Sequence, residues 1–497
     1  MRSHNPILLS VAAAALCFAV ASRAQDRPSE PFDRTILIAR AEELAKQPFV
    51  EPTQPEGGKL EKLSYDQYRS IRFQKGAAIF AHQNRTFTLE LFHPGFIYAT
   101  PVNVNIVTDG ARRVFFTNQI FDYGPDVPTL QSTEDMGYSG FRVRANINTT
   151  DYMDEFLVFQ GASYFRAVAR AQQYGQSARG LAIRTARPEG EEFPVFTDFW
   201  VERPPVNAKK IVIHALLQSP SVVGAYTFTA QPGDETVMDV DATLFSRREV
   251  SAFGIGPLTS MFLFDESSPA RFDDYRRAVH DSDGLQILNG NGERVWRQLA
   301  NPKTLQVSVF MDQNPRGFGL LQRKRRFDDY EDFEARYELR PSLWVEPRGD
   351  WGQGHVELIE IPTDREIHDN IVAFWQPATP LKPGEAANFS YRLRWTAEPL
   401  DDSLARVVAT RTGKASGEQR TFVIDFQHAT PIPDDVEIHL TSSTGRVLEP
   451  RGEKVTPEDT YRVSFELDPE RDLSELRLVL MSKGKPWSET WLYRWAR

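Results

Sequence analysis

Apolar and polar residues alternate with a period of two along much of the chain. In residues 85–92, Phe87, Leu89 and Leu91 are separated by polar residues, and the His-Pro-Gly sequence at 93–95 favours a turn. Successive side chains of a strand point to opposite faces, so this alternation predicts strands with one buried face. Comparable runs, separated by turns rich in Gly, Pro, Asn and Asp, occur at 98–107, 209–217, 224–240, 304–310 and 355–361.

One short helix is expected near the start of the chain. Asp33 can cap residues 34–46, whose Ile, Leu and Ala spacing suits a helix, and Pro48 would stop it. The chain has no internal repeat of the kind that builds solenoids or propellers. Many strands, frequent turns and few helical periods together predict an antiparallel β-sandwich architecture.

A domain boundary is predicted near residues 396–404. Residues 389–395 look like a final strand, and residues 396–402 are polar and contain a proline, as linkers do. The size and alternation of residues 403–497 predict an immunoglobulin-like β-sandwich without its disulfide, following a larger β-sandwich domain at 25–396. The alternating segments of this C-terminal part are 422–426, 436–440, 461–467, 476–480 and 491–495.

Residues 1–24 have the composition of a secretory signal peptide. Arg2 precedes an apolar run at 7–20, and small residues lead up to Ala24. The alternative is a buried N-terminal helix, because the run is too short for a comfortable transmembrane helix. Cleavage near Ala24 would remove Cys17 and leave a mature chain without cysteine, which suits an oxidising compartment such as the periplasm or the cell exterior.

The charge balance narrows the classes of partner. The 497 residues carry a net charge of -10, with 25% charged and 41% apolar residues, as in an ordinary folded protein. An acidic surface argues against nucleic acid or an anionic membrane as the main partner. A single cysteine excludes a disulfide framework and any cysteine-based zinc or iron–sulfur site.

Metal and cofactor motifs are mostly absent. The sequence has no Walker motif, no H-E-x-x-H, no G-x-S-x-G and no C-x-x-C. Residues 281–284 begin like a calcium loop but lack the later acidic ligands, which argues against an EF-hand. His280 and His368 each stand beside an Asp, but they lack metal-ligand spacing. We therefore predict neither a metal site nor a cofactor.

Aromatic and acidic residues are enriched together in residues 327–375. This segment contains Trp344, Trp351 and Trp375 together with two tyrosines and many Asp and Glu residues. Planar aromatic rings stack on sugar faces, and two carboxylates in different environments can hydrolyse a glycosidic bond. Aromatic enrichment also arises from core packing, so composition leaves both interpretations open.

Eight strings of residues form a specific combination, although each alone would be weak. The strings are 161–166, 174–182, 190–194, 257–262, 280–285, 317–323, 339–342 and 369–375. Together they resemble one family, the osmoregulated periplasmic glucan biosynthesis proteins of the G and D type. The resemblance runs from about residue 30 to 395 and more loosely to the C-terminus.

The resemblance implies a fold and a function. It implies an N-terminal β-sandwich related to galactose-mutarotase-like folds, followed by the immunoglobulin-like domain. It implies a periplasmic protein needed to build glucans with a β-1,2-linked backbone, and some members are inverting endo-β-1,2-glucanases. The implied partners are the β-1,2-linked glucan, a membrane-bound glucan synthase and a second copy of the chain in a homodimer.

The resemblance also assigns roles to residues. In the glucanase members the general acid falls on Asp369 and the general base, acting through water, on Asp281, and both motifs are intact here. Glu366 is also present, and Tyr337 and Arg340 match a string expected to line the sugar cleft. No metal or organic cofactor is needed for this acid–base chemistry.

The physical character of these positions fits the roles. Asp369 precedes an apolar strand at 371–375, and shielding by Trp351 and Trp375 would raise its pKa and keep it protonated. Asp281 stands in a polar turn and should stay ionised, as a base must. Without the resemblance, a turn-capping Asp and a strand-end Asp would be the simpler interpretations.

Two other functions remain open from sequence. The first is a non-catalytic glucan-binding or scaffold protein of the synthesis machinery, because catalytic residues can persist in slow enzymes. The second, from fold analogy alone, is a sugar mutarotase or a transglycosylase. The sequence does not separate the G type from the D type, although residues 1–24 lack the adjacent arginines of a twin-arginine signal.

Overall fold

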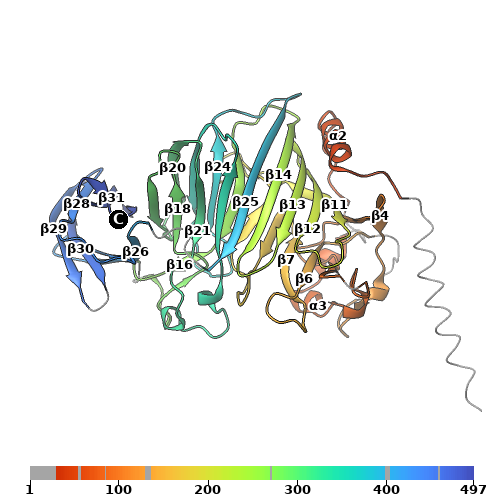
Figure 1. Ribbon diagram of the computed structural model, residues 1–497, viewed down its shortest axis with the longest axis horizontal. Coiled ribbons are helices and arrows are strands. Elements are labelled where there is room, and N and C mark those ends of the chain that lie inside the picture. Colours follow the sequence, from red (N-terminus) through yellow and green to blue (C-terminus); the bar gives the residue numbers. More distant parts are fainter. Residues whose placement is uncertain are drawn as a thin grey trace, which may run out of the picture.

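The structure is a computed structural model that describes residues 29–53, 58–83, 85–128, 136–268, 271–397, 403–456 and 459–497. It is mainly β, as predicted (Figure 1). The predicted signal peptide and Cys17 lie outside the described residues, as does most of the predicted linker. Neither described α-helix combines the length and the apolar character that crossing a membrane would take.

The predicted helix is confirmed. Helix α2 (Arg34–Ala45) begins after Asp33, whose carboxylate accepts a hydrogen bond of 2.8 Å from the backbone N–H of Ile36. This bond satisfies one of the donors that every helix N-terminus leaves free. The helix packs Leu37 and Ala41 onto the outer face of a large sheet. A second, shorter helix is α3 (Tyr65–Arg69).

The largest sheet has 15 strands and runs the whole length of the molecule. In spatial order its strands are β28 (Glu437–Ser442), β31 (Leu473–Ser482), β33 (Thr490–Ala496), β19 (Arg294–Gln298), β18 (Gly284–Leu288), β21 (Gly317–Leu321), β22 (Ser342–Arg348), β25 (Ala386–Thr396), β14 (Thr236–Ser246), β13 (Val222–Gln231), β12 (Ile211–Gln218), β11 (Val195–Glu202), β3 (Asn103–Val107) and β4 (Ala111–Val114), with β32 (Lys485–Pro486) on β31.

A second sheet of 10 strands faces the central part of the first across the main core. Its strands in spatial order are β2 (Phe87–Phe92), β6 (Gly140–Ala145), β7 (Asp154–Gln160), β8 (Tyr164–Ala167), β9 (Ser177–Arg179), β15 (Phe253–Ser260), β24 (Ile371–Pro377), β23 (Gln353–Glu360) and β20 (Gln306–Gln313), with β10 (Ala182–Ile183) on β15.

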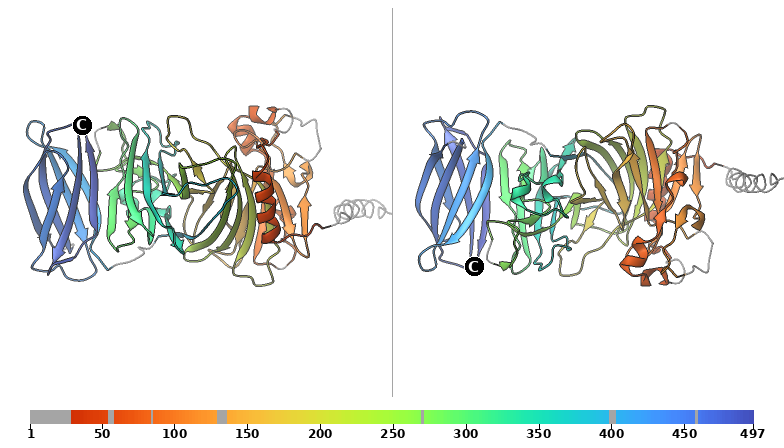
Figure 2. Two further views of the ribbon diagram at one scale, coloured as in Figure 1. Left: turned by 90° about the horizontal axis from the view of Figure 1, so that it is seen from above. Right: turned by 90° about the horizontal axis from the view of Figure 1, so that it is seen from below.

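The C-terminal part adds a smaller sheet at one end of the molecule (Figure 2). The remaining strands form this four-stranded sheet and two isolated pairs. The four strands are β26 (Arg406–Lys414), β27 (Arg420–Gln427), β30 (Thr460–Asp468) and β29 (Arg446–Val455), and the pairs are β1 (Arg72–Phe73) with β5 (Phe121–Asp122) and β16 (Phe262–Phe264) with β17 (Val279–His280).

The C-terminal strands are joined to the rest by main-chain pairing. Strand β33 lies parallel to β19, with Trp491 opposite Trp296, so one sheet continues through the predicted domain boundary. Trp296, Leu321 and Trp344 pack into the same apolar cluster as the C-terminal side chains. The likeness to galactose-mutarotase-like and immunoglobulin-like folds stays a prediction.

Aromatic side chains from both large sheets interlock in the main core. Phe159 on β7 and Phe165 on β8 lie 5.2 Å and 5.3 Å, between ring centroids, from Phe228 on β13. Side chains alternate along a strand, so the neighbours of Phe159 and Phe165 on β7 and β8 point away from this core. That outward face of the ten-stranded sheet carries the pocket described below.

The run at 224–240 was expected to be a single strand, and the structure corrects this expectation. The chain instead turns between β13 and β14, which form an antiparallel hairpin from Val222 to Ser246. Most side chains on both strands are buried, because helix α2 covers the outer face of the sheet here. The turn itself is marked in the sequence by Pro232 and Gly233, followed by two acidic residues, which the interpretation of 224–240 as one run passed over.

Gly284, at the start of β18, is predicted to be intolerant of a side chain. A Cβ atom there would lie 2.1 Å from Cζ2 of Trp296, a side chain only 1% exposed. We expect Gly284→Ala to lower the free energy of unfolding by about 1–3 kcal/mol, because the indole must move within a packed core. Urea denaturation measures this loss, and Gly413→Ala is the matched control, since nothing lies within 4 Å of its Cβ. Equal stability of the two variants would contradict the prediction.

Candidate active site

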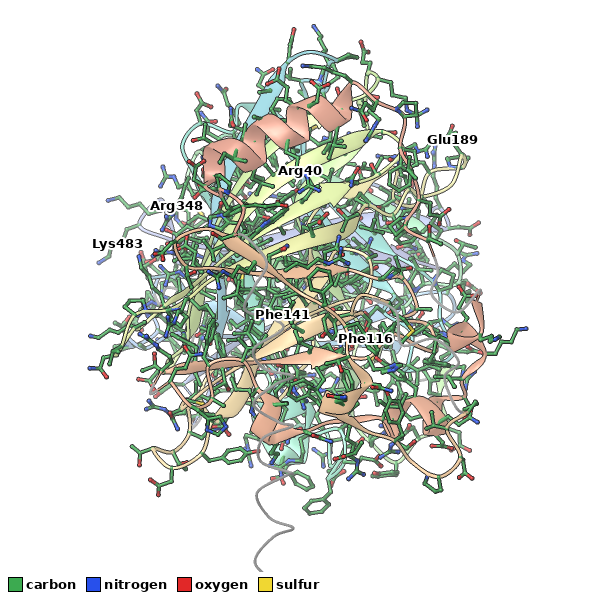
Figure 3. The ribbon with its side chains drawn as sticks, turned by 90° about the vertical axis from the view of Figure 1, so that its right-hand side faces the viewer. Arg40, Phe116, Phe141, Glu189, Arg348 and Lys483 are labelled. Carbon is green, nitrogen blue, oxygen red and sulfur yellow. The ribbon has the colours of Figure 1, made fainter. Side chains whose placement is uncertain are left out.

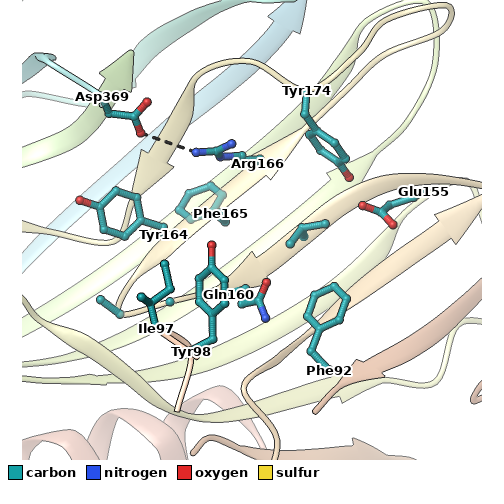
Figure 4. Close-up of a pocket in the computed structure, with 13 residues that line it drawn as sticks. Phe92, Ile97, Tyr98, Glu155, Gln160, Tyr164, Phe165, Arg166, Tyr174 and Asp369 are labelled. Carbon is teal, nitrogen blue, oxygen red and sulfur yellow. Dashed lines mark ion pairs between the residues drawn. The ribbon is translucent and has the colours of Figure 1, made fainter. Parts of the chain in front are cut away.

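A pocket of about 550 Å³ opens on the outer face of the ten-stranded sheet (Figure 4). Strands β7 and β8 form its floor, and Asp369 reaches its wall from the loop that precedes β24. Aromatic and polar side chains alternate around it, which is the lining expected for a hydroxyl-rich ligand. The lining residues used below are Tyr98, Glu155, Gln160, Tyr164, Arg166 and Tyr174.

Asp369 is held in place by its neighbour in sequence. The side-chain amide of Asn370 accepts a hydrogen bond of 2.8 Å from the backbone N–H of Phe262 and donates to the carbonyls of Phe262 and Ile361, both at 3.0 Å. Asn370 is thereby fixed at the start of β24 and Asp369 faces the pocket, with 33% of its side chain exposed. One carboxylate oxygen lies 3.6 Å from Nη2 of Arg166.

Burial raises the pKa of the Asp369 carboxyl above its usual value. The negative charge of Asp281 acts in the same direction, whereas the Arg166 guanidinium is the main influence that lowers this pKa. The desolvation effect prevails, so the proton is held more tightly than on an exposed aspartate. A carboxyl of this kind is suited to donate a proton.

Asp281 is also tied to the segment that holds Asn370. Its backbone N–H donates a hydrogen bond of 2.8 Å to the carbonyl of Met261, the residue before Phe262. Its carboxylate is 6% exposed and forms an ion pair with Arg340. Two adjacent residues, Met261 between β15 and β16 and Phe262 at the start of β16, thus position both predicted catalytic aspartates.

The structure brings together, beside Asp281, the three other polar residues that were predicted for the site. The Arg340 guanidinium lies 4.2 Å from the ring centroid of the buried Tyr337. The Tyr337 hydroxyl donates to Glu366 at 3.3 Å, and Glu366 forms an ion pair of 2.8 Å with Arg276. Arg340, Tyr337 and Glu366 therefore form one connected network beside Asp281.

Trp351 and Trp375, in contrast, do not reach the pocket. They are 5% and 0% exposed, and both belong to the main core, with ring centroids 6.4 Å apart. Trp375 lies toward the far end of β24 from Asp369. The expectation that these indoles shield Asp369 or contact sugar is corrected, because a strand pattern does not tell which aromatic rings face the core.

Tyrosines and an arginine that sequence reasoning did not single out occupy the place expected for the indoles. Tyr164 lies at the pocket wall, with the guanidinium of Arg179 4.6 Å from its ring centroid, and burial raises the pKa of its hydroxyl. Arg166 faces Asp369 and donates to the Ser177 hydroxyl at 2.7 Å. Tyr164, Arg166 and Tyr174 belong to the strings 161–166 and 174–182, which the family resemblance had already picked out. Only the fold shows that these residues lie around the same pocket as Asp369 (Figure 4).

The other polar residues of the Asp281 motif are buried. The His280 ring stacks on Phe262 at 5.3 Å, its Nδ1 contacts Gln322, and burial holds its pKa well below the usual value. Burial raises the pKa of the Asp283 carboxyl to about 6, and its oxygens accept from the backbone N–H of Arg323. Among the described residues, no three His, Cys, Asp or Glu side chains are grouped so as to hold a metal ion.

The raised pKa of Asp369 predicts a pH-dependent stability. A carboxyl whose pKa is higher in the folded chain than in the unfolded chain favours folding at low pH, and this contribution is lost as the pH rises through the folded pKa. Asparagine does not titrate, so Asp369→Asn should gain in melting temperature relative to the parent as the pH rises from about 4 toward neutrality. Thermal unfolding across this pH range measures the difference in melting temperature between variant and parent, and Asp364→Asn, at an exposed position, is the control. A difference that does not change with pH would contradict the prediction.

Comparison with known proteins identifies the family. Residues 32–495 match the family described as "Periplasmic glucan biosynthesis protein, MdoG". Glucans biosynthesis protein G of Shewanella frigidimarina is 48% identical over 472 residues, which cover 93% of this chain and 84% of the relative. Glucans biosynthesis protein G 1 of Shewanella oneidensis is 46% identical over 472 residues, which cover 93% of this chain and 87% of that protein. The chain therefore belongs to the MdoG family of periplasmic glucan biosynthesis proteins.

Proposed function

We propose that this protein is an anomer-inverting endo-β-1,2-glucanase that trims glucan during its synthesis in the periplasm. The observation that carries the proposal is a pocket whose wall holds Asp369 with a raised pKa, close enough to Asp281 for the charge of one carboxylate to affect the other. Two carboxyl groups in different environments are what inverting glycosidic hydrolysis requires.

Asp369 is the general acid. Its raised pKa makes the protonated form more populated than on an exposed aspartate, and its position at the pocket wall suits contact with the oxygen that bridges two glucose units. Arg166, at 3.6 Å, stabilises the carboxylate that remains after the proton has moved. After the proton has passed to the leaving sugar, the Asp369 carboxylate thus stays paired with Arg166.

Asp281 is the general base. Its carboxylate forms an ion pair with Arg340, and a carboxylate is a group that can accept a proton from water. In an inverting reaction the base acts through a water molecule on the opposite face of the sugar ring. Glu366, Tyr337 and Arg340 form the network that fixes the direction of this carboxylate.

The remaining pocket residues suit a neutral glucan. Tyr98 and Tyr164 offer aromatic surface for the apolar face of glucose, and Gln160 and Glu155 offer groups that bond to hydroxyls. A pocket that is open at the surface can hold a segment inside a long chain, which an endo-acting enzyme needs.

The test is to incubate the purified mature protein with linear β-1,2-glucan. We expect short β-1,2-linked oligosaccharides, and proton NMR at early times should show new reducing ends in the α-configuration. Initial β-anomers would indicate retention and thereby contradict the inverting mechanism. Absence of any product at high enzyme concentration would overturn the proposal.

A non-catalytic glucan-binding or scaffold role is the second candidate. The observation that favours it is Asp281 itself, whose carboxylate is 6% exposed and already engaged by Arg340. A carboxylate held in this way has little surface left to contact a water molecule. Protection of the protein against thermal unfolding by glucan, without new reducing ends, would favour this role.

The homodimer and the membrane-bound glucan synthase stay predictions. Both come from the family resemblance rather than from any surface described above. Light scattering on the mature protein would measure its oligomeric state, and a mass of one chain would contradict the homodimer.

A further inference from the structure

A second pocket, of about 570 Å³, lies on the outer face of the fifteen-stranded sheet, beside helix α2. Strands β11, β3 and β4 form the edge of the sheet here, and their pairing places polar side chains in rows. Asp198 stands opposite Asn103, Trp200 opposite Asn105, and Asn105 opposite Arg113. All five residues line the pocket.

The floor of this pocket is held by hydrogen bonds. The side-chain amide of Asn103 donates to Asp198 at 2.9 Å, and that of Asn105 donates to the carbonyl of Phe199 at 3.0 Å. Asp198 is 7% exposed and also accepts a hydrogen bond of 2.8 Å from the hydroxyl of Thr197. The carboxylate and the two amides are therefore oriented before any ligand arrives.

Three arginines, Arg40, Arg112 and Arg113, and two aromatic rings form the walls. Arg40 belongs to helix α2 (Figure 3). Its guanidinium lies 5.5 Å from the ring centroid of Trp200 and 3.9 Å from Asp198. The Arg113 guanidinium lies 5.2 Å from the ring centroid of Phe115, a side chain that is 40% exposed. The pocket thus combines flat apolar surface with fixed charged and amide groups.

This combination points to a ligand rich in hydroxyl groups. A hydroxyl both donates and accepts hydrogen bonds, and the pocket offers carboxylate and amide oxygens as acceptors together with guanidinium and amide N–H groups as donors. The lining holds three arginines and two carboxylates, those of Asp198 and Glu30, so the charges nearly balance, which suits a neutral polar ligand. An apolar ligand would leave these polar groups unpaired. The aromatic rings suit the apolar face of a sugar.

We propose that this pocket is a second saccharide site, which binds a segment of β-1,2-linked glucan; the identity of the sugar rests on the proposed function. The two sites lie on opposite outer faces of the fold. Phe159 of β7 and Phe199 of β11 meet in the core between them, with ring centroids 5.3 Å apart. A short oligosaccharide therefore cannot span both sites, and each site binds its own molecule. A long glucan held at the second site, in contrast, stays with the enzyme between cleavages.

Calorimetry with a short linear β-1,2-linked gluco-oligosaccharide tests this proposal. Asp369→Asn serves as background, so that the ligand is not consumed. We expect two molecules bound per chain in this background and one when Asn103→Ala and Asn105→Ala are added. Arg40→Ala should weaken one of the two binding events by about tenfold, whereas Arg34→Ala, an exposed position on the same helix that does not line the pocket, should leave both unchanged.

The outcomes separate this proposal from the proposed function. Binding of one molecule per chain that is lost with Arg166→Ala and unaffected by Arg40→Ala would overturn the second site and leave the glucanase standing. Two bound molecules without cleavage by the parent protein would support the second site and overturn the glucanase. If the oligosaccharide does not bind at all, the proposal of a second site is overturned. If the double asparagine variant does not fold, Arg40→Ala and Asn105→Gln carry the test.

Discussion

Asp369→Asn is expected to lower the rate of β-1,2-glucan cleavage by about 10²–10⁴-fold, the range that a positioned general acid supplies. The amide has nearly the same shape as the carboxyl but has no proton to give to the leaving sugar. Glucan binding should be retained, because the pocket floor on β7 and β8 is unchanged. A reducing-end assay measures the rate, and calorimetry measures binding. Activity within tenfold of the parent would remove Asp369 from the acid role.

A substrate with a good leaving group sharpens this test. An aryl β-1,2-linked oligosaccharide whose phenol departs without protonation needs no general acid, but it still needs a base to activate water. Asp369→Asn should therefore regain much of its activity on this substrate, and Asp281→Asn should not. Equal losses for the two variants would contradict the separate roles that we assign to the two aspartates.

Glu489→Ala is expected to lower the free energy of unfolding by about 3–5 kcal/mol, the largest stability effect that we predict. The Glu489 carboxylate is fully buried and accepts from Arg323 Nη1 at 2.5 Å, Arg323 Nη2 at 2.9 Å and the backbone N–H of Val407 at 2.7 Å. Its removal leaves the guanidinium of Arg323 and the amide of Val407 buried without this partner. Chemical denaturation followed by circular dichroism measures the loss.

Two variants control for this loss. Glu489→Gln keeps an acceptor in place and should lose less than Glu489→Ala. Glu437→Ala removes a glutamate whose side chain is 71% exposed, and it should change the free energy of unfolding by less than about 0.5 kcal/mol. A loss for Glu489→Ala no larger than that for Glu437→Ala would show that the buried pair is not stabilising.

The strands could be predicted where one face is polar. The alternation in 422–426 and 461–467 corresponds to β27 and β30, where buried positions alternate with partly exposed ones. The turn of the hairpin from Val222 to Ser246 is marked by Pro232 and Gly233, a signal that the alternation of 224–240 alone does not capture. The sequence does not encode that helix α2 covers the outer face of this hairpin, because that covering is a tertiary effect.

The site was predictable only in part, for a related reason. Asp281, Asp369, Tyr337, Arg340 and Glu366 were found from motifs, and the structure places the last three in one network beside Asp281. The expectation that Trp351 and Trp375 contact the sugar was wrong, because the number of Trp residues in a segment does not show which rings face the core. The pocket tyrosines come from segments far earlier in the chain, such as Tyr98 and Tyr164.

The parallel pairing of β33 with β19 has a mechanical consequence. Asp281 lies just before β18, which pairs with β19, so an unbroken ladder of main-chain hydrogen bonds leads from the C-terminal strands to the loop that holds Asp281. A rigid-body hinge between the two parts would have to break that ladder. Any movement that the proposed glucan binding requires must therefore come from the loops around the pocket, while the C-terminal strands keep their place on the sheet.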